Sequence, residues 1–159
     1  IMGCSNSKSR IGHKFSNGTL RHVITKWFIN PTKVEKKYGP IGSWDVSEVT
    51  SMSHLFHNRS NFNSDISCWD TSKVTTMQDM FHGASHFNQP IGDWDVSKVV
   101  NMLGMFDSAE SFNQDISCWD VANVKSMYEM FRRAYLFNRN IGDWDMRNVT
   151  DKRGIFSGC

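Results

Sequence analysis

Residues 87–99 read FNQPIGDWDVSKV, and close copies of this stretch recur every 25 residues along the chain. The tryptophan returns five times, and an isoleucine, a valine and a phenylalanine keep the same step. The repeated positions are Trp44, Trp69, Trp94, Trp119 and Trp144; Ile41, Ile66, Ile91, Ile116 and Ile141; Val49, Val74, Val99, Val124 and Val149; and Phe56, Phe81, Phe106, Phe131 and Phe156. A fixed period of this length is typical of a solenoid, in which each repeat forms one coil stacked on the next.

The repeats divide the chain into three regions. We predict a basic tail over residues 1–15, a helical N-terminal cap over 16–39, and a repeat solenoid over 40–159. Its coils are 40–64, 65–89, 90–114, 115–139 and 140–159. The cap contains Leu20, Val23, Ile24, Trp27 and Phe28 at the spacing of an amphipathic helix. A shorter helix is expected from about residue 32 to residue 37, after Asn30-Pro31 ends the first.

Each coil is expected to contain one short strand and one helix. Residues 65–69 are extended in character, whereas Val74, Met77, Met80 and Phe81 lie at helical spacing. Ser72 suits an N-cap and Gly83 a helix end. The sequence therefore predicts an α/β solenoid of about five coils, with a parallel sheet of short strands on one face and helices on the other.

Charge is distributed unevenly between the two parts of the chain. Residues 1–39 hold eight lysines and arginines but a single glutamate, while the remainder is acidic. A basic head on an acidic body argues against a nucleic-acid-binding solenoid and suits a head that meets an anionic membrane surface. No apolar run is long enough to cross a membrane.

The cysteines give a weak indication of redox compartment. Cys68 and Cys118 share a repeat position two coils apart. At about 4.8 Å per coil they would lie farther apart than the ~7 Å Cα limit for a disulfide. We therefore predict free thiols and a reducing compartment.

The chain resembles the BspA-like leucine-rich repeat family of mycoplasma surface lipoproteins, which also occurs in algae, protists and large viruses. The resemblance lies in residues 87–99 followed by Met102 and Met105-Phe106, and in the lead-in at Thr19-Leu20, Trp27 and residues 37–41; it covers about residues 19–159. It implies a leucine-rich-repeat solenoid, surface or membrane association, and adhesion or protein binding. It implies no enzyme activity.

Two polar ladders have a structural and a functional interpretation. The aspartates are Asp45, Asp70, Asp95, Asp120 and Asp145, and the asparagines are Asn63, Asn88, Asn113 and Asn138. The aspartates could form Ca²⁺ sites, but the other oxygen ligands are not consistently present, so we expect them to bond backbone N–H groups. We expect inward-turned asparagines that bond the backbone of the bend.

Metal sites and catalytic constellations receive little support. The repeated methionines could bind copper(I), but their spacing beside Val and Phe favours core packing. His54, His57 and His82 could form a surface metal site. Asp107 and Arg132 break that row, so we expect no metal. The sequence contains no Ser/His/Asp or Cys/His constellation, no phosphate-binding Gly loop and no carboxylate pair outside the ladders, so we expect no cofactor and no enzyme activity.

A solenoid binds partners through side chains that vary from coil to coil. One such row is His57, His82, Asp107 and Arg132, and another is Ser43, Cys68, Asp93, Cys118 and Asp143. These rows are the candidate partner-binding surface.

The N-terminus contains a candidate lipid-attachment site. Residues 2–7, MGCSNS, match the myristoylation pattern with Gly3 as acceptor, and Cys4 is a candidate for palmitoylation. Lys8, Arg10 and Lys14 supply basic charge beside it. One myristoyl chain binds membranes weakly, so a second lipid or a basic patch is needed. Covalent myristate and palmitate are the only non-protein groups expected.

Ile1 conflicts with this prediction, because myristoylation requires Gly3 to follow the initiating methionine. A bacterial lipobox over residues 1–4, with Cys4 as lipid acceptor, is the alternative. We expect a non-catalytic docking or structural subunit at a membrane, facing the cytoplasm if myristoylated. The alternatives are a cell-surface adhesin or lipoprotein, and a stabilising subunit of a larger membrane complex or capsid without lipid.

Overall fold

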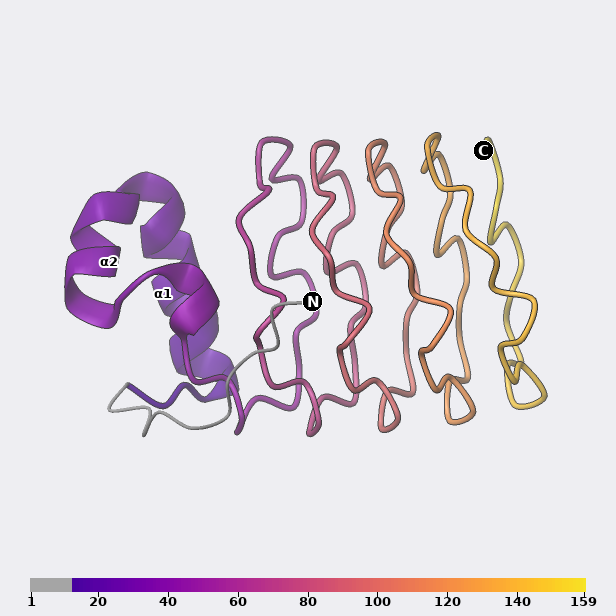
Figure 1. Cartoon of the computed structure of the whole chain (residues 1–159), viewed down its shortest axis with the longest axis horizontal. Coiled ribbons are helices and arrows are strands. Elements are labelled where there is room, and N and C mark those ends of the chain that lie inside the picture. Colours follow the sequence, from indigo (N-terminus) through magenta and orange to yellow (C-terminus); the bar gives the residue numbers. More distant parts are fainter. Residues whose placement is uncertain (1–12) are drawn as a thin grey trace.

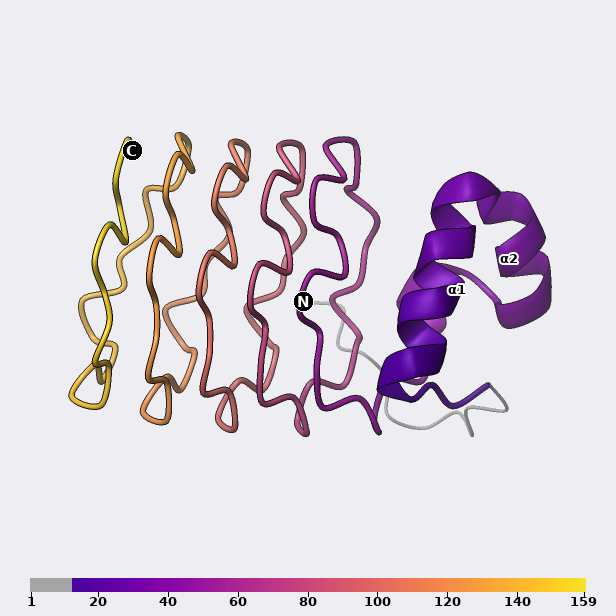
Figure 2. The same cartoon turned by 180° about the vertical axis from the view of Figure 1, so that it is seen from behind.

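The structure is a computed structural model that describes residues 13–159. Two helices lie at one end, and the repeats form a row of stacked coils that ends at the C-terminus (Figure 1). The view from behind shows the same order of coils (Figure 2). The stack is therefore elongated, and each internal coil contacts its two neighbours.

The two helices predicted for the cap are present. α1 spans Asn17–Ile29 and α2 spans Pro31–Tyr38. Ser16 begins α1 with a capping box to Thr19. The Asn30 side chain accepts a hydrogen bond from the Lys33 N–H at 3.0 Å and so begins α2, where Pro31 fills the first turn. A single turn of 3-10 helix, η1 (Ile41–Ser43), leads into the first coil.

A ladder of backbone hydrogen bonds joins each coil to the next. The N–H of Met52 donates to the carbonyl of Thr76 at 3.0 Å, and the N–H of Met77 donates to the carbonyl of Asn101 at 2.9 Å. The peptide unit between Thr76 and Met77 thus accepts from the preceding coil and donates to the following one. Three further peptide units of that coil do the same. Their carbonyl groups, at Gln78, Met80 and His82, accept from the N–H groups of His54, Phe56 and Asn58, respectively, at 2.7–2.9 Å.

The predicted leucine-rich-repeat solenoid, with a sheet on one face and helices on the other, is wrong. Within residues 13–159 no β-strand occurs, and the only helices are α1, α2 and η1. Isolated parallel bridges replace the sheet; they pair Ser51 with Thr76, Thr76 with Asn101, Asn101 with Ser126, and Ser126 with Asp151. The coils are built from turns.

Left-handed residues explain the absence of a helix in each coil. His54 and Asn58 have φ of 59° and 56°, and the same two positions are left-handed in every coil, as at Asp79 with φ of 50°. Such residues cannot continue a right-handed helix. Residues such as Met77 and Met80 close short turns with hydrogen bonds between residues three apart, so their spacing imitates that of a helix.

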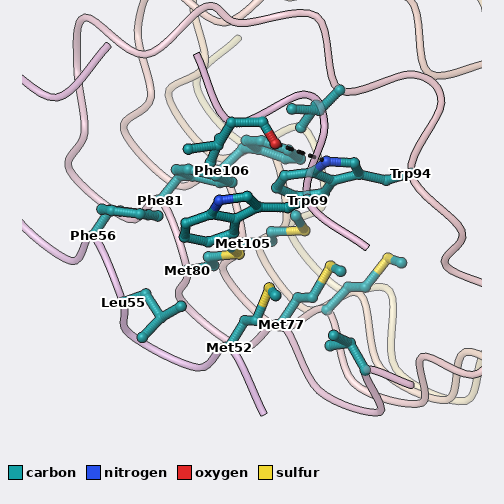
Figure 3. Close-up of a cluster of buried hydrophobic side chains, with 14 of the residues drawn as sticks. Met52, Leu55, Phe56, Trp69, Met77, Met80, Phe81, Trp94, Met105 and Phe106 are labelled. Atoms are coloured by element: carbon teal, nitrogen blue, oxygen red, sulfur yellow. Dashed lines mark hydrogen bonds between the residues drawn. The ribbon is translucent and has the colours of Figure 1, made fainter. Parts of the chain in front are cut away.

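Aromatic side chains form continuous columns inside the stack. Phe56, Phe81, Phe106, Phe131 and Phe156 lie 5.5–5.7 Å apart with nearly parallel rings. A second column, Phe62, Phe87, Phe112 and Phe137, packs against the first. Met52, Met77, Met80 and Met105 fill the space beside these rings (Figure 3). Burial of each ring contributes about 1.5–3 kcal/mol, so the columns are a main source of stability.

The repeated tryptophans join the core to the backbone of the coil before. The indole N–H of Trp94 donates to the carbonyl of Ile66 at 3.3 Å, as the dashed line in Figure 3 shows. Trp69, Trp119 and Trp144 make the equivalent bond at 2.9–3.2 Å. A buried indole N–H needs a partner, and this one also fixes the register between coils.

The asparagine ladder lies at the surface, so the expected inward orientation is wrong. Asn63 and Asn138 are exposed, and Asn88 is half-buried. The Asn88 side-chain oxygen accepts from the Asn113 N–H at 3.0 Å and from the Gln114 amide at 2.8 Å. Asn63, Asn88 and Asn113 thus bind the backbone of the next coil, not that of their own bend.

Replacing Asn88 by alanine should destabilise the stack. The change leaves the Asn113 N–H without its acceptor, and we expect a loss of about 1–3 kcal/mol in the free energy of unfolding. Asn138→Ala is the matched control, because the Asn138 side chain accepts no hydrogen bond within residues 13–159. It should cost less than about 0.5 kcal/mol. Urea denaturation checks both values, and equal losses would contradict the ladder.

Candidate functional site

Ionisable side chains run along one side of the stack. We call this set the ion row: His54, His57, Asp79, His82, Asp107, Glu129 and Arg132. Its first part is a histidine pair, in which the rings of His57 and His82 stack with centroids 4.6 Å apart and an interplanar angle of 5°. The repeat places these rings one above the other, because they occupy the same position in adjacent coils.

Two carboxylates lie beside the histidines. Asp79 is within 3.6 Å of His54 Nδ1 and 3.5 Å of His82 Nδ1. Gly104 follows Asp79 at the same repeat position, and a Cβ there would collide with the Asp79 carboxylate. The glycine therefore leaves room for this carboxylate between coils.

Asp107 lies inside the row and is not available to a partner. It is only 2% exposed, although the sequence placed it on the binding surface. Its carboxylate lies 3.6 Å from Arg132 Nε and 3.8 Å from His82 Nδ1, and it accepts from the Ser108 hydroxyl at 2.8 Å. Asp107 thus connects the histidines to the arginine, and only its neighbours are accessible.

Arg132 is held between two acids. It donates to Glu129 at 2.7 Å and also lies beside Asp107. This hydrogen bond to Glu129, with the charges of Asp107 and Glu129, raises the pKa of Arg132. Its side chain is about one-third exposed, so a partner can still reach the guanidinium edge.

The second predicted row is exposed along its whole length. Ser43, Asp93, Asp143, Cys68 and Cys118 are all at the surface. Cys118 is a free thiol, but Cys68 is disulfide-bonded, so the prediction of a free thiol at Cys68 is wrong. The argument for a reducing compartment therefore loses its basis.

The aspartate ladder forms local turns. The Asp95 carboxylate accepts from the N–H and the hydroxyl of Ser97 at 3.0 and 2.6 Å, which lowers its pKa. The side chain and backbone of Arg147 bind Asp145 and lower its pKa to about 2. Asp70 and Asp120 likewise accept from the N–H two residues ahead. No group of three or more His, Cys, Asp or Glu residues within 13–159 is arranged to hold a metal ion.

A basic cleft lies between the two helices of the cap. It has a volume of about 640 Å³ and is lined by Lys26, Ile29, Asn30, Lys33, Val34, Lys36, Lys37 and Tyr38. Ile29 is 80% exposed at its edge. An exposed aliphatic side chain among four lysines is the combination found on surfaces that meet anionic lipid.

The N-terminal candidates fall largely outside the described residues. Gly3, Cys4, Lys8 and Arg10 lie before residue 13. Lys14 is described, and its ammonium pairs with Glu48 at 3.1 Å. This exposed pair contributes little stability, but it reduces the charge that Lys14 offers to a membrane.

Sequence reasoning missed Asp79, Glu129 and the cleft. An acid three residues before His82 and another three before Arg132 were the available signals, since three-residue spacing brings side chains together in short turns as well as in helices. The sequence showed the lysines of the cap only as charge. It could not place Ile29 among them, because that position depends on how α1 and α2 pack in the folded chain.

Comparison with known proteins identifies one family. The model of the family described as "Mycoplasma protein of unknown function, DUF285" matches residues 24–117 and, in a second placement, residues 66–159. No curated protein and no solved structure matches the chain significantly.

The histidine pair should make stability depend on pH. Partial burial, followed by the nearby His82 and His54, lowers the pKa of His57 below its ordinary value of 6.5. The unfolded chain then binds this proton more readily. The stabilisation is complete above pH 6.5 and is lost as the pH falls through the depressed pKa.

His57→Gln removes this titration. Urea denaturation between pH 8 and pH 5 should show a smaller loss in the free energy of unfolding for this variant than for the unchanged chain. His22→Gln, on the exposed side of α1, is the control and should follow the unchanged chain. Parallel curves for all three proteins would rule out a contribution from the pair.

Proposed function

Since the chain belongs to the DUF285 family of mycoplasma-type repeat proteins, we propose that it is a non-catalytic docking subunit that binds another protein at a membrane surface. The ion row is the observation that supports this function most. Its accessible members are His54, His57, His82, Glu129 and Arg132, and they stand on a backbone whose geometry repeats from coil to coil. Repetition with variation builds a broad and specific surface.

Preorganisation makes the ion row suitable for recognition. Glu129 and the buried Asp107 fix the Arg132 guanidinium, and the backbone ladder fixes the spacing of the coils. These side chains would therefore lose little conformational entropy when a partner binds. Arginine is also a residue type that contributes strongly to interfaces.

The proposed membrane attachment has two parts. An acyl chain on Gly3 would supply the anchor, and the basic cleft of the cap would supply attraction to anionic lipid, at about 1 kcal/mol per charge near the surface. Within residues 13–159 no helix is long and apolar enough to cross a membrane. The mass of the native N-terminal peptide separates acylated Gly3 from a lipidated Cys4 that begins the mature chain.

Two other functions use the same surfaces. A cell-surface adhesin would bind an external partner through the ion row, and a subunit of a membrane complex or capsid would bind its neighbours without lipid. The first requires export of the chain. The second requires copurification at fixed stoichiometry even after removal of the N-terminal tail.

Charge reversal in the ion row should release the partner. Arg132→Glu places a carboxylate beside Asp107 and Glu129, and we expect at least about a tenfold loss of the copurifying protein, as is typical when a preorganised interface charge is inverted. Quantitative mass spectrometry of native captures measures the loss. Lys98→Glu is the matched control, because it reverses an exposed charge outside the row. Retention of every partner by Arg132→Glu, with an unchanged melting curve, would contradict the proposal.

Neutralising the cleft should weaken membrane binding. Replacing Lys33, Lys36 and Lys37 by glutamine in the full chain should reduce its partition onto phosphatidylserine vesicles by about tenfold or more at low salt. Lys98, Lys125 and Lys152 replaced together by glutamine remove the same charge from the stack and serve as the control. Equal losses in the two triple variants would show that net charge, not the cap, governs binding. Vesicle sedimentation measures the partition.

A further inference from the structure

The acids and the bases of the ion row lie at different depths. The side chains of Asp79 and Asp107 are 13% and 3% exposed. The side chains of His54, His82 and Arg132 are 32–46% exposed. A partner that approaches the row therefore meets the basic and titratable groups first, with these two carboxylates behind them.

Glu129, the remaining acid of the row, is already occupied. Its side chain is 23% exposed and accepts from Arg132 Nη1 at 2.7 Å. A guanidinium has five N–H donors, and within residues 13–159 the Nη2 atom of Arg132 makes no hydrogen bond. The pair thus offers a free donor to a partner, not a free carboxylate.

The histidine rings use their Nδ1 atoms inside the row. His54 Nδ1 lies 3.4 Å from His57 Nδ1 and 3.6 Å from the Asp79 carboxylate. His82 Nδ1 lies 3.5 Å from the same carboxylate. Within residues 13–159 no hydrogen bond or ion pair involves the Nε2 atom of any of these rings. Because a charged imidazole donates from both nitrogens, each protonated ring could offer its Nε2–H to a partner.

The surroundings of the histidine pair oppose its protonation in the free chain. Burial, followed by the nearby His82 and His54, lowers the pKa of His57, and Asp79 acts in the opposite direction. The charged and titratable groups packed around the pair are His54, Asp79, Asp107, Glu129 and Arg132 from the coils, and Arg21 from α1, which binds the Ser53 carbonyl beside His54. A carboxylate bound at Nε2 would offset the repulsion between the rings and favour their charged form.

We infer that the ion row binds an acidic segment of the partner protein, and that protonation of His57 and His82 strengthens this binding. Arg132 would hold one carboxylate whether or not the histidines are charged, and the two rings would hold others once they are protonated. Histidine changes its charge between pH 5 and pH 8, so the affinity rises as the pH falls. The inference rests on the proposed docking function and adds the chemistry of the partner and its regulation.

Binding and protonation are linked in both directions. If a lower pH tightens binding, the bound segment must raise the proton affinity of the rings by the same free energy. Affinity measured against pH and ring titration measured with and without the segment therefore report on one quantity. Agreement between the two separates protonation of the pair from a general effect of net charge.

An octa-aspartate peptide is the probe, because aspartate carboxylates remain charged between pH 7.5 and pH 5.5. Fluorescence anisotropy of the rhodamine-labelled peptide, titrated with the full chain, gives the Kd at each pH. We expect the Kd to fall at least about tenfold from pH 7.5 to pH 5.5. Arg132→Glu should weaken binding at both pH values.

A pair of double variants assigns the pH dependence to the row. His57→Gln with His82→Gln removes the two titrations, and the Kd should then fall by no more than about threefold. His22→Gln with His86→Gln removes two exposed histidines outside the row and should keep the tenfold change. The lysines of the cap are the same in all three proteins, so peptide bound to them cancels in the comparison.

NMR of the imidazole rings tests the unchanged chain, and so does not depend on the stability of any variant. The peptide should raise the pKa of the His57 and His82 rings by at least about 0.5 each, which together corresponds to the tenfold change in affinity. The rings of His22 and His86 should titrate as they do without peptide.

Three results would overturn the inference. The first is an affinity for octa-aspartate that does not rise on acidification, and the second is an equal pH dependence in the two double variants. The third is a response of the His57 and His82 rings to an octa-lysine peptide but not to octa-aspartate, which would indicate a basic partner. If any of these occurs while Arg132→Glu still releases the native partner, the docking function stands and only the chemistry of the partner is wrong.

Discussion

The peptide ladder between the coils is the interaction on which the rest of the structure depends. In each internal coil four peptide units accept from the coil before and donate to the coil after, and bonds such as Thr75 N–H to the Thr50 carbonyl run in the opposite direction. Every buried backbone group needs a partner, and here the partner comes from the neighbouring repeat instead of from a helix or a sheet. The aromatic columns can form only because this ladder holds equivalent positions directly above one another. The fold is therefore stable as a stack, and a single coil would leave both its hydrogen bonds and its rings unpaired.

The ladder also gives the stack an electrostatic direction. Between adjacent coils four backbone bonds run one way and others, such as Thr75 N–H to the Thr50 carbonyl and His86 N–H to the Ser60 carbonyl, run the opposite way, so the peptide dipoles leave only a net direction, with carbonyl groups toward the cap. Basic residues are favourable near a carbonyl end, and the contact of Arg21 with the Ser53 carbonyl is one example. The basic cap therefore has a structural as well as a functional explanation. The two are compatible, since Arg21 faces the stack while the lysines of the cleft lie between α1 and α2.

The sequence predicted the repeat, the cap helices and the identity of the core. Trp94, Met77 and Phe81 are buried. α1 lies where periodicity placed it, and α2 lies after Asn30-Pro31, where a second short helix was expected. The sequence-based prediction of a helix in each coil was wrong, because Met77, Met80 and Phe81 have a spacing shared by helices and by successive short turns. Only the left-handed φ values at residues such as His54 and Asp79 distinguish the two, and neither residue type requires that conformation. The burial of Asp107 was equally hidden, since it depends on His82 and Arg132 from adjacent coils.

Native-state hydrogen exchange under increasing denaturant tests the central role of the ladder most directly. The account predicts that the slowest amides are those donating between the internal coils, at Met77, Asp79, Phe81 and Gly83 and at Met102, Gly104, Phe106 and Ser108, and that they open together in the global unfolding of the stack. It also predicts that amides of α2 exchange earlier, because this helix buries only Val34. Slowest exchange in the cap, with the inter-coil amides opening at low denaturant, would contradict the account.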